Sequence, residues 1–543
     1  MTGTYMKRRL VFLAIVVLAA ASPQAQVSFD RLLKANGEPH NWLTYSGNVF
    51  NERYSRLTQV TPANAKNLEL QWVWQARSLE KFEATPLVVD GIMYTVEAPN
   101  NVIALDAATG RIFWRYDYTP NANARLCCGR VNRGLAIHGD TLFMGTIDAY
   151  LLAIDAKSGQ LLWRTQVADS AQRYSITHAP LIVKDKVLVG TAGGDMDIRG
   201  LLAAFDVKTG KEAWRFYTIP GPGEPGHETW SGDSWKVGGT GIWNIGAYDP
   251  ETNLTFWGTG NPAPDWDGRT RLGDNLYSDS VVALDADTGK LKWHYQFTPH
   301  DELDYDSTQV PILADIEYEG RQRTVMLWAN RNGVMYLLDR VTGEFLRGKP
   351  YVAVNWMDGF DAKGRPKRVP GKLPSPEGTL IQPAVFGGTN WAPPSYSPRT
   401  GLFYVAVTEN SSTVAVLGEF PRNAGQNPRA YPMGQTNLSQ NYNFEAESHG
   451  SIRAFDPKTL EKKWEFNMAD ITWAGVLTTA TDVLFSGGKE GYFFALDART
   501  GELLWKSALG GQVNSGPMSY AVNGRQYVAV AAGNSLFSFA LRQ

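Results

Sequence analysis

One sequence unit recurs along most of this chain, and it constrains the fold more than any other feature. Residues 104–114 read Ala-Leu-Asp-Ala-Ala-Thr-Gly-Arg-Ile-Phe-Trp, an apolar run, a D-x-x-[TS]-G turn and a second run that carries Trp. Asp and Thr or Ser side chains can hydrogen-bond the backbone of such a turn, and Gly adopts positive φ without steric cost. Each copy therefore predicts a β-hairpin. The Asp that marks each copy stands at Asp106, Asp155, Asp206, Asp285, Asp339, Asp456 and Asp497.

The Trp of the unit is equally regular, with one exception. It recurs at Trp114, Trp163, Trp214, Trp293, Trp464 and Trp505. The copy marked by Asp339 has Arg347 at this position, and the copy marked by Asp456 has Leu460 where the others have Gly. A Trp at one fixed position can fill the space between neighbouring sheets and place its N–H on a partner.

A second strand pair is predicted upstream of most copies. In residues 86–94 and 135–145 two apolar runs flank a short Gly- and Asp-containing turn, which is a hairpin signal. Four short antiparallel strands per repeat describe a β-propeller blade. Seven copies and a further strand set at Met518–Leu541 make eight blades, and Leu70–Trp74 can supply the missing outer strand that closes the ring. We expect an all-β, eight-bladed propeller.

Longer insertions interrupt the spacing at residues 221–235, 262–274, 354–389 and 418–448. We expect them to be too irregular for strands and to form the functional face. The first contains a literal G-x-G-x-x-G, but its two prolines make a helical phosphate site implausible, so we interpret it as a loop.

Composition excludes several classes of protein. The 543 residues are 43% hydrophobic and 20% charged, as in globular chains. Lys and Arg number 52 against 54 Asp and Glu, a net charge of −2, so the concentrated positive surface that binds nucleic acid is absent. The two cysteines, Cys127 and Cys128, are neighbours, which excludes an attached haem and a cysteine-rich zinc or iron–sulfur site.

Residues 1–25 are predicted to be a secretory signal peptide. Three basic residues at 7–9 precede an apolar run over residues 10–21 and then small residues. The run is about half of the ~20 residues that span a bilayer, which disfavours the alternative of a membrane anchor. Its removal takes away three positive charges and no negative one, so the net charge changes from −2 to −5. We expect a periplasmic protein without a membrane span, whose residues 26–543 form one domain.

Two local motifs suggest chemistry. Adjacent Cα atoms lie ~3.8 Å apart whereas disulfides prefer about 4.4–6.8 Å, so a Cys127–Cys128 bridge requires a distorted peptide in a tight ring. Two free neighbouring thiols would hardly persist in an oxidising compartment, and the alternative to the bridge is a pair of buried thiols.

The second motif is the acidic segment 300–306. If it is extended, Asp304 and Asp306 point to one side, because alternate residues of a strand share a face. Two neighbouring oxygen ligands suit a hard, highly charged cation better than zinc. A solvated acidic loop is the alternative.

Together these motifs resemble a known family. The cysteine pair, the Trp-marked repeat, Gly258–Pro264, His300–Asp306 and Asn330–Gly333 are similar to segments of the pyrroloquinoline-quinone (PQQ) dependent alcohol dehydrogenases. This is the methanol and ethanol dehydrogenase group of quinoproteins, and the likeness runs from Trp42 to about Leu541.

The resemblance implies a cofactor site. A bridged Cys127–Cys128 would cap one face of the quinone, and Trp243 would stack on the other. The remaining positions that match cofactor contacts are Glu83, Arg133, Thr177, Asn390, Trp473 and Gly475. Asp304 matches the catalytic base, and Arg331 matches the residue that steadies the quinone oxygen. Ala192 and Gly241 stand where relatives often carry a hydroxyl.

The resemblance also implies a metal ion held by Asp195, Asn261 and Asp304. Asp195 stands where the family usually has the longer Glu, four residues before Arg199. Asp306 falls where the lanthanide enzymes carry Asp and the calcium enzymes carry a small or uncharged residue. We therefore expect one lanthanide ion, with calcium as the alternative, because an extra anionic oxygen offsets a trivalent charge.

The implied reaction is oxidation of a small alcohol to an aldehyde by hydride transfer to metal-bound PQQ. Because the chain has no CxxCH, the electrons are expected to pass to a separate cytochrome c, and a homodimer is possible. Two alternatives remain. One is a non-enzymatic propeller scaffold of the outer-membrane assembly type, and the other is a quinoprotein that acts on sugars or aldehydes.

Overall fold

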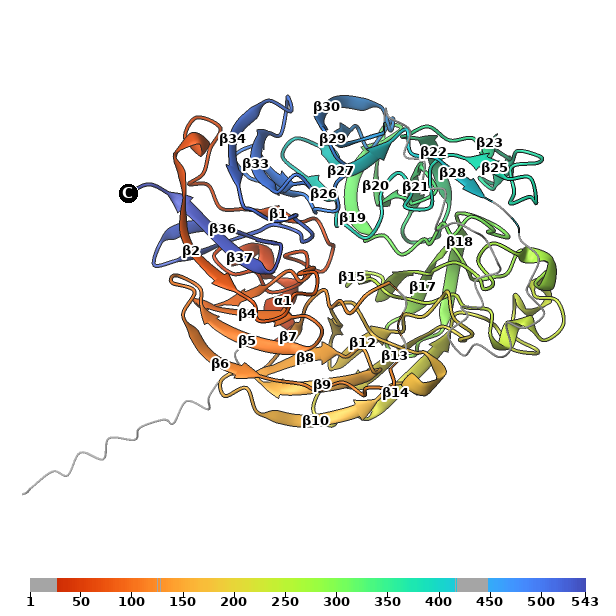
Figure 1. The fold of residues 1–543 in the computed structure, drawn as a ribbon, viewed down its shortest axis with the longest axis horizontal. Coiled ribbons are helices and arrows are strands. Elements are labelled where there is room, and N and C mark those ends of the chain that lie inside the picture. The colour runs from red at the N-terminus through yellow and green to blue at the C-terminus, as the bar shows by residue number, and fades with distance from the viewer. Residues whose placement is uncertain (1–26, 125, 127, 416, 418–447) are drawn as a thin grey trace, which may run out of the picture.

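The computed structural model describes residues 27–543 except for residues 125, 127, 416 and 418–447, and its sheets are arranged in a ring (Figure 1). The described residues form eight sheets of at least four strands, which confirms the eight-bladed propeller. The predicted signal peptide and the segment 418–447 lie outside the described residues, so these predictions stay untested.

The first four blades follow the chain in order. They contain β3 (Leu87–Val89), β4 (Ile92–Glu97), β5 (Asn101–Asp106) and β6 (Ile112–Tyr116); β7 (Ala136–His138), β8 (Thr141–Gly145), β9 (Tyr150–Asp155) and β10 (Leu161–Gln166); β11 (Leu181–Val183), β12 (Lys186–Gly190), β13 (Leu201–Asp206) and β14 (Glu212–Tyr217); and β15 (Ala247–Asp249), β16 (Leu254–Gly258), β17 (Ser280–Asp285) and β18 (Leu291–Gln296).

The other four blades complete the ring. They contain β19 (Ile312–Tyr318), β20 (Arg321–Ala329), β21 (Val334–Asp339) and β22 (Phe345–Pro350); β26 (Ser395–Ser397), β27 (Leu402–Glu409), β29 (His449–Phe455) and β30 (Lys462–Met468); β31 (Leu477–Thr479), β32 (Val483–Gly487), β33 (Tyr492–Asp497) and β34 (Leu503–Ala508); and β35 (Met518–Val522), β36 (Arg525–Ala532), β37 (Ser535–Leu541) and β2 (Leu68–Gln75). The outer strands β6, β10 and β34 lie on the perimeter (Figure 1).

The ring closes by pairing the two ends of the chain. Strand β2 pairs antiparallel with β37, from Leu68 opposite Leu541 to Gln75 opposite Ser535. The closing strand predicted at Leu70–Trp74 is therefore confirmed. This pairing satisfies the backbone of what would otherwise be an open sheet edge.

The blades pack through the Trp and Gly of the repeat. The ring of Trp464 covers Gly501 in the turn of the next blade, where φ is +78° and an added Cβ would lie 2.6 Å from Trp464 Cε3. Trp464 Nε1 also donates a 3.0 Å hydrogen bond to the carbonyl of Ala498. The same Trp-on-Gly contact joins Trp72 to Gly110, Trp114 to Gly159, Trp163 to Gly210, Trp214 to Gly289 and Trp293 to Gly343.

The two exceptions in the repeat belong to one interface. Arg347 lies on β22, and Leu460 lies in the turn of the following blade, where a Trp and a Gly would otherwise meet. Leu460 is 2% exposed despite a φ of +58°, and it shares an apolar cluster with Tyr318, while Leu346 packs against that cluster. At this interface the outer strand of the preceding blade has no Trp, and a buried leucine takes the place of the turn glycine.

An N-terminal segment runs through the centre of the ring. After the helix α1 (Phe29–Leu33), residues 49–55 hydrogen-bond the innermost strands of four successive blades. The contacts are Val49 with Tyr248, Phe50 with Leu313, Glu52 with Tyr396, Arg53 with Thr478, and the parallel pairing of β1 (Tyr54–Ser55) with β31.

Arg53 extends this central segment to two further blades, those of β3–β6 and β35–β37. Its guanidinium is fully buried and donates to the carbonyls of Tyr45 (2.9 Å) and Pro517 (3.0 Å) and to Thr85 Oγ1 (3.0 Å). A Cβ on Gly516 would lie 2.1 Å from Arg53 Nη2, so this position requires glycine. The segment therefore fixes the inner strands relative to one another.

The insertions differ in part from expectation. Residues 354–389 hold β23 (Met357–Phe360), β24 (Pro366–Arg368) and β25 (Thr379–Ile381), so the prediction that they are too irregular for strands is wrong. Strands β23 and β24 pair, and β25 pairs with β28 (Thr413–Ala415). These ribbons are two-stranded, and the Trp-marked repeat does not extend into them, which is why the sequence pattern did not reveal them.

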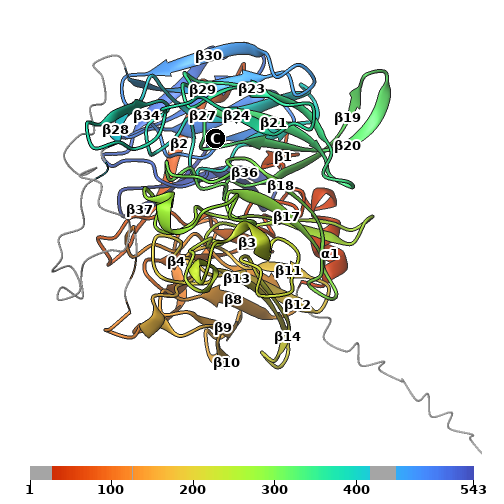
Figure 2. The same ribbon diagram turned by 90° about the vertical axis from the view of Figure 1, so that its right-hand side faces the viewer.

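Short 3-10 turns account for the described helical residues outside α1. They are Ala35–Gly37, Ala65–Asn67, Ser170–Gln172, His227–Thr229, Ser234–Lys236 and Gly268–Thr270. The side view shows the β19–β20 hairpin standing out from the body of the disc (Figure 2). Within the described ranges, no helix has the length and hydropathy needed to cross a membrane.

Gly501→Ala tests the Trp-on-Gly contact. We expect it to destabilise the protein by about 1–2 kcal/mol for a side chain at positive φ, and by a further ~1–3 kcal/mol for the overlap with Trp464. Gly401→Ala is the matched control, because Gly401 has a φ of +69° but nothing within 4 Å of an added Cβ. Denaturant unfolding of both variants measures the difference, and equal losses would contradict the contact.

A double-mutant cycle tests the exceptional interface. Leu460→Gly should cost about 2 kcal/mol or more through lost burial, and Arg347→Trp should overpack against Leu460 by about 1–3 kcal/mol. The double variant restores the regular pair, so we expect a favourable coupling of about 0.5–3 kcal/mol in unfolding free energy. Strict additivity would show that the two positions are independent.

Candidate functional site

The segments that lead into the innermost strands, together with three inter-strand loops, surround a cavity of about 200 Å³. Of the predicted site residues, the following line it: Glu83, Cys128, Arg133, Thr177, Asp195, Trp243, Asn261, Asp304, Asp306, Arg331, Asn390 and Trp473. These side chains come from seven blades, so only the closed ring brings them together.

Two predicted site residues stand apart. Cys127 lies outside the described residues, so the predicted bridge to Cys128 stays a prediction. Gly475 is not among the lining residues; it lies behind the wall, where its N–H donates to the carbonyl of Ser515 (3.1 Å) and an added Cβ would lie 2.6 Å from Pro393 Cγ.

Arg331 organises the acidic side of the cavity. Its Nη2 donates to Asp304 Oδ2 (2.9 Å), its Nη1 to Asp306 Oδ2 (2.6 Å) and its Nε to the carbonyl of Val385 (2.7 Å). The segment 300–306 is not extended throughout as expected, because His300 and Asp304 have left-handed φ values of +51° and +56°. A shared arginine, rather than strand alternation, makes the two carboxylates converge.

Asn261 joins the same group from the loop after β16. Its backbone N–H donates to Asp306 Oδ1 (2.9 Å), and its Nδ2 donates to Asp265 Oδ1 (2.7 Å). This leaves Asn261 Oδ1 buried without a hydrogen-bond partner among the described residues, and Asp304 Oδ1 is in the same condition. Asp195 faces them from the loop between β12 and β13, and its Oδ2 lies 3.8 Å from Cys128 Sγ.

The carboxylates of this cluster outnumber the nearby positive charges. Burial, and then the charge of Asp306, raises the pKa of Asp195 to about 7. Burial raises the pKa of Asp304 well above its ordinary value, with Arg331 opposing and Asp306 adding to the effect. Burial lowers the pKa of Arg331, but the surrounding carboxylates outweigh it and hold that pKa above its ordinary value.

These observations fit a hard cation. The Asn261 and Asp304 oxygens that lack a partner within the described ranges, beside the carboxylates of Asp195 and Asp306, are the donor types that such ions prefer. A multivalent cation would also offset the surplus negative charge, since a nearby opposite charge favours the ionised carboxylate.

The other walls of the cavity carry aromatic, small and cationic side chains. The guanidinium of Arg133 lies over the rings of Trp243 (5.1 Å) and Trp391 (4.9 Å) and pairs with Glu83 at 2.9 Å. Thr177 Oγ1 accepts from Arg133 Nη1 at 3.2 Å. Ala192, Gly193 and Gly194 line the cavity between these walls. Flat rings, small residues and positive charges suit a planar aromatic acid such as PQQ.

Sequence reasoning missed several lining or neighbouring residues. Lys81 and Phe386 line the cavity without belonging to any motif, and Trp391 entered only as the neighbour of Asn390. Asp265 binds Asn261 from four residues downstream, and its presence in the same loop was the available signal. Phe386 is the one lining residue from the described insertions, so their expected role as the functional face is limited.

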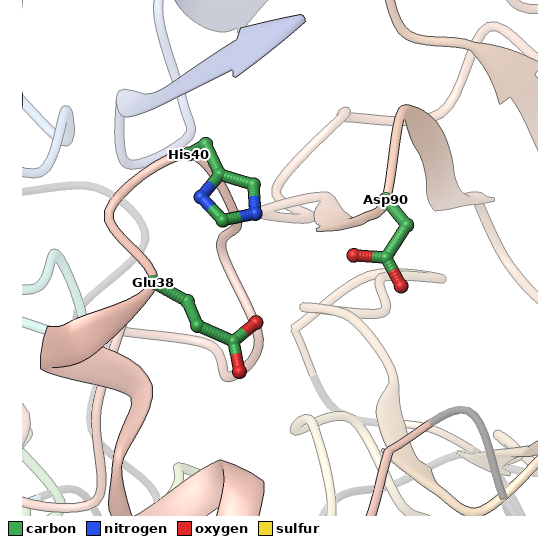
Figure 3. A group of neighbouring side chains, drawn as sticks. All are labelled: Glu38, His40 and Asp90. Atoms are coloured by element: carbon green, nitrogen blue, oxygen red, sulfur yellow. The ribbon is translucent and has the colours of Figure 1, made fainter. Parts of the chain in front are cut away.

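A different acidic group lies away from this cavity. Glu38, His40 and Asp90 approach one another closely enough to hold a metal (Figure 3). Arg31 already pairs with Glu38 (2.7 Å) and with Asp90 (2.6 Å). A resident arginine therefore already binds both carboxylates of this group.

Comparisons with known proteins agree with the geometry. Residues 42–354 and 467–528 match the family described as glucose/ethanol/alcohol dehydrogenase, beta-propeller domain. The chain is 38% identical to quinohemoprotein alcohol dehydrogenase ADH IIB of Pseudomonas putida, over 96% of this chain and 77% of that protein. It is 35% identical to the lanthanide-dependent methanol dehydrogenase of Methylacidiphilum fumariolicum, over 93% and 86%.

Comparison with a solved structure also indicates this family. The quinohemoprotein alcohol dehydrogenase ADHIIG from Pseudomonas putida HK5 superposes with a TM-score of 0.89 at 35% identity, covering 96% of this chain and 83% of that one. The scaffold alternative is therefore wrong. With its closed eight-bladed ring and its acidic, aromatic-walled cavity, this chain belongs to the PQQ-dependent alcohol dehydrogenase family.

Proposed function

We propose that this enzyme oxidises small alcohols to aldehydes in the described cavity and passes the electrons to a separate cytochrome c. The observation that carries the proposal is a pair of buried oxygens beside Arg331, Asp304 Oδ1 and Asn261 Oδ1, which have no hydrogen-bond partner in the described part of the chain. The Asp304 oxygen can take a proton, and both oxygens can ligate a cation. The same cavity also offers a flat space, or planar slot, for the cofactor.

The cavity residues divide into two sets. Trp243 and Cys128 would hold the faces of PQQ, with Glu83, Arg133, Thr177 and Asn390 at its polar edges. Asp195, Asn261, Asp304 and Asp306 would hold the metal. When bound, PQQ supplies a two-electron acceptor and the metal supplies a Lewis acid.

Asp304 is the proposed base. Arg331 holds its Oδ2 at 2.9 Å and leaves Oδ1 directed to take the proton of the alcohol hydroxyl. Because burial raises the pKa of Asp304, the site needs additional positive charge to keep this carboxylate ionised near neutral pH. Arg331 supplies part of that charge and stabilises negative charge that develops beside it.

The proposed metal is a lanthanide ion, with calcium as the alternative. Asp306 adds an anionic oxygen to the donor set, and its two oxygens are held in place by Asn261 N–H and Arg331. Each carboxylate oxygen has a second lone pair, so these hydrogen bonds leave it able to ligate. The similar methanol dehydrogenase that is named lanthanide-dependent supports this choice.

Export and electron transfer complete the proposal. The predicted leader at residues 1–25 and a Cys127–Cys128 bridge are both consistent with the periplasm. The reported relatives are named alcohol or methanol dehydrogenases, which favours alcohols over the alternative of sugars or aldehydes. The given 543 residues contain no CxxCH, which favours a separate cytochrome c as the proposed electron acceptor.

Asp304→Asn tests the base. We expect a loss of at least ~10²–10⁴-fold in dye-linked alcohol oxidation, because the amide cannot accept the proton. The circular dichroism spectrum and PQQ content should be retained. Asp358→Asn is the control, since Asp358 is an exposed carboxylate on β23. Normal turnover by Asp304→Asn would refute the assignment.

Reconstitution tests the metal. Metal-free protein loaded with PQQ and either calcium or a light lanthanide should be more active with the lanthanide. Asp306→Ala should weaken lanthanide binding about tenfold (~1.4 kcal/mol) relative to calcium. Metal content and activity are measured together. Full activity with calcium, unaffected by Asp306→Ala, would establish the calcium alternative.

A further inference from the structure

We propose that Lys81 is a carboxylate-binding residue at the solvent edge of the cavity. The proposal rests on the proposed function, since the carboxylate belongs to a molecule bound in that cavity. Lys81 is exposed yet lines the cavity, and it stands two residues before Glu83 on the segment that leads into β3. No motif pointed to it.

Charge pairing sets Lys81 apart from the other lining cations. Arg133 pairs with Glu83 at 2.9 Å, and Arg331 pairs with Asp304 and Asp306 at 2.9 and 2.6 Å. Across the part of the chain that the structure describes, Lys81 has neither a hydrogen bond nor an ion pair. Its ammonium is therefore the lining cation left available for an external anion.

Trp473 holds this ammonium at the cavity wall. Lys81 Nζ lies 4.8 Å from the centroid of the Trp473 ring, and Trp473 is itself a lining residue. Such a contact is weak at an exposed site, and it leaves N–H donors of the ammonium able to bind an anion. It therefore orients the lysine while its donors stay free to bind.

A second lysine strengthens the positive potential at this wall. Lys489 Nζ lies 4.5 Å from the same Trp473 ring, and Phe386 packs on that ring at 5.7 Å between centroids. Burial and the charge of Lys81 lower the pKa of Lys489, while Asp470 opposes them.

Two carboxylates lie near Lys81 in the sequence, and each faces an arginine: Glu83 pairs with Arg133 at 2.9 Å and Glu80 faces Arg130 at 3.6 Å. Burial raises the pKa of Glu83, and the charges of Arg133 and Lys81 oppose that rise.

The ligand chemistry that fits is a single carboxylate. One ammonium beside a planar slot provides a point charge and rotating donors, whereas bidentate recognition of a larger anion calls for a guanidinium. Two sources supply a carboxylate here: an acid group of the cofactor, or an acid group at the far end of an alcohol substrate. The two sources make different predictions for the same variant.

The variant Lys81→Met decides between these two sources of the carboxylate. The variant is prepared with PQQ and metal bound, and its kcat/KM values for a neutral and an anionic alcohol are compared. If the cofactor supplies the carboxylate, the Kd for PQQ rises about tenfold and the kcat/KM ratio of 6-hydroxyhexanoate to 1-hexanol is unchanged. If the substrate supplies it, that ratio falls about tenfold and the Kd for PQQ is unchanged. Lys81→Arg should restore either quantity, because the charge returns.

Controls separate this inference from the proposed function. Lys458→Met removes an exposed lysine from a turn remote from the cavity and should change neither quantity. Wild-type protein that binds PQQ and oxidises 1-hexanol upholds the proposed function whatever Lys81 does. If Lys81→Met then leaves both the Kd for PQQ and the substrate ratio at wild-type values, the role of Lys81 is overturned.

Discussion

The contact of an outer-strand tryptophan with a turn glycine of the next blade is the interaction on which this structure depends. It needs both partners, because only a residue without Cβ lets the indole lie against the turn at positive φ. The contact also satisfies the indole N–H at Trp72, Trp114, Trp214 and Trp464. It occurs at six of the eight interfaces between the described blades, where it sets the spacing of the blades. The spacing of the blades also fixes the dimensions of the cavity, since the cavity walls come from the inner ends of seven blades.

The centre of the ring is held by different means. Residues 49–55 pair with innermost strands one after another, and Arg53 reaches Thr85 and Pro517 on the blades that close the ring. Thr85 N in turn donates to the carbonyl of Arg133, which carries the cofactor-facing guanidinium. The polar cavity is therefore supported from behind by backbone hydrogen bonds. This support allows charged groups to be buried in fixed positions beside small and aromatic walls.

The fold was largely predictable because each blade repeats its own local signals. The D-x-x-[TS]-G turn, the Trp position and the closing strand near Trp72 required no long-range information. The short ribbons β23–β24 and β25–β28 were missed because they lie outside the repeat. The site was predictable residue by residue through family resemblance, yet the left-handed backbone of Asp304 and the bond from Asn261 to Asp265 were not. Both features lie in irregular segments between strands, which the repeated strand and turn pattern does not describe.

The sequence by itself determined the number of blades, the way the ring closes and the kinds of residue available for chemistry, because local turn and strand preferences repeat within each copy. Only the tertiary structure decided which charges meet. It places Arg331 between Asp304 and Asp306, pairs Arg133 with Glu83, and leaves Lys81 beside Trp473 with no acid partner among the described residues. The physical reason is that these contacts join loops far apart in the sequence: the Arg133–Glu83 and Lys81–Trp473 contacts link different blades, and Arg331 links two separate segments of one blade. Their distances are therefore set by tertiary packing.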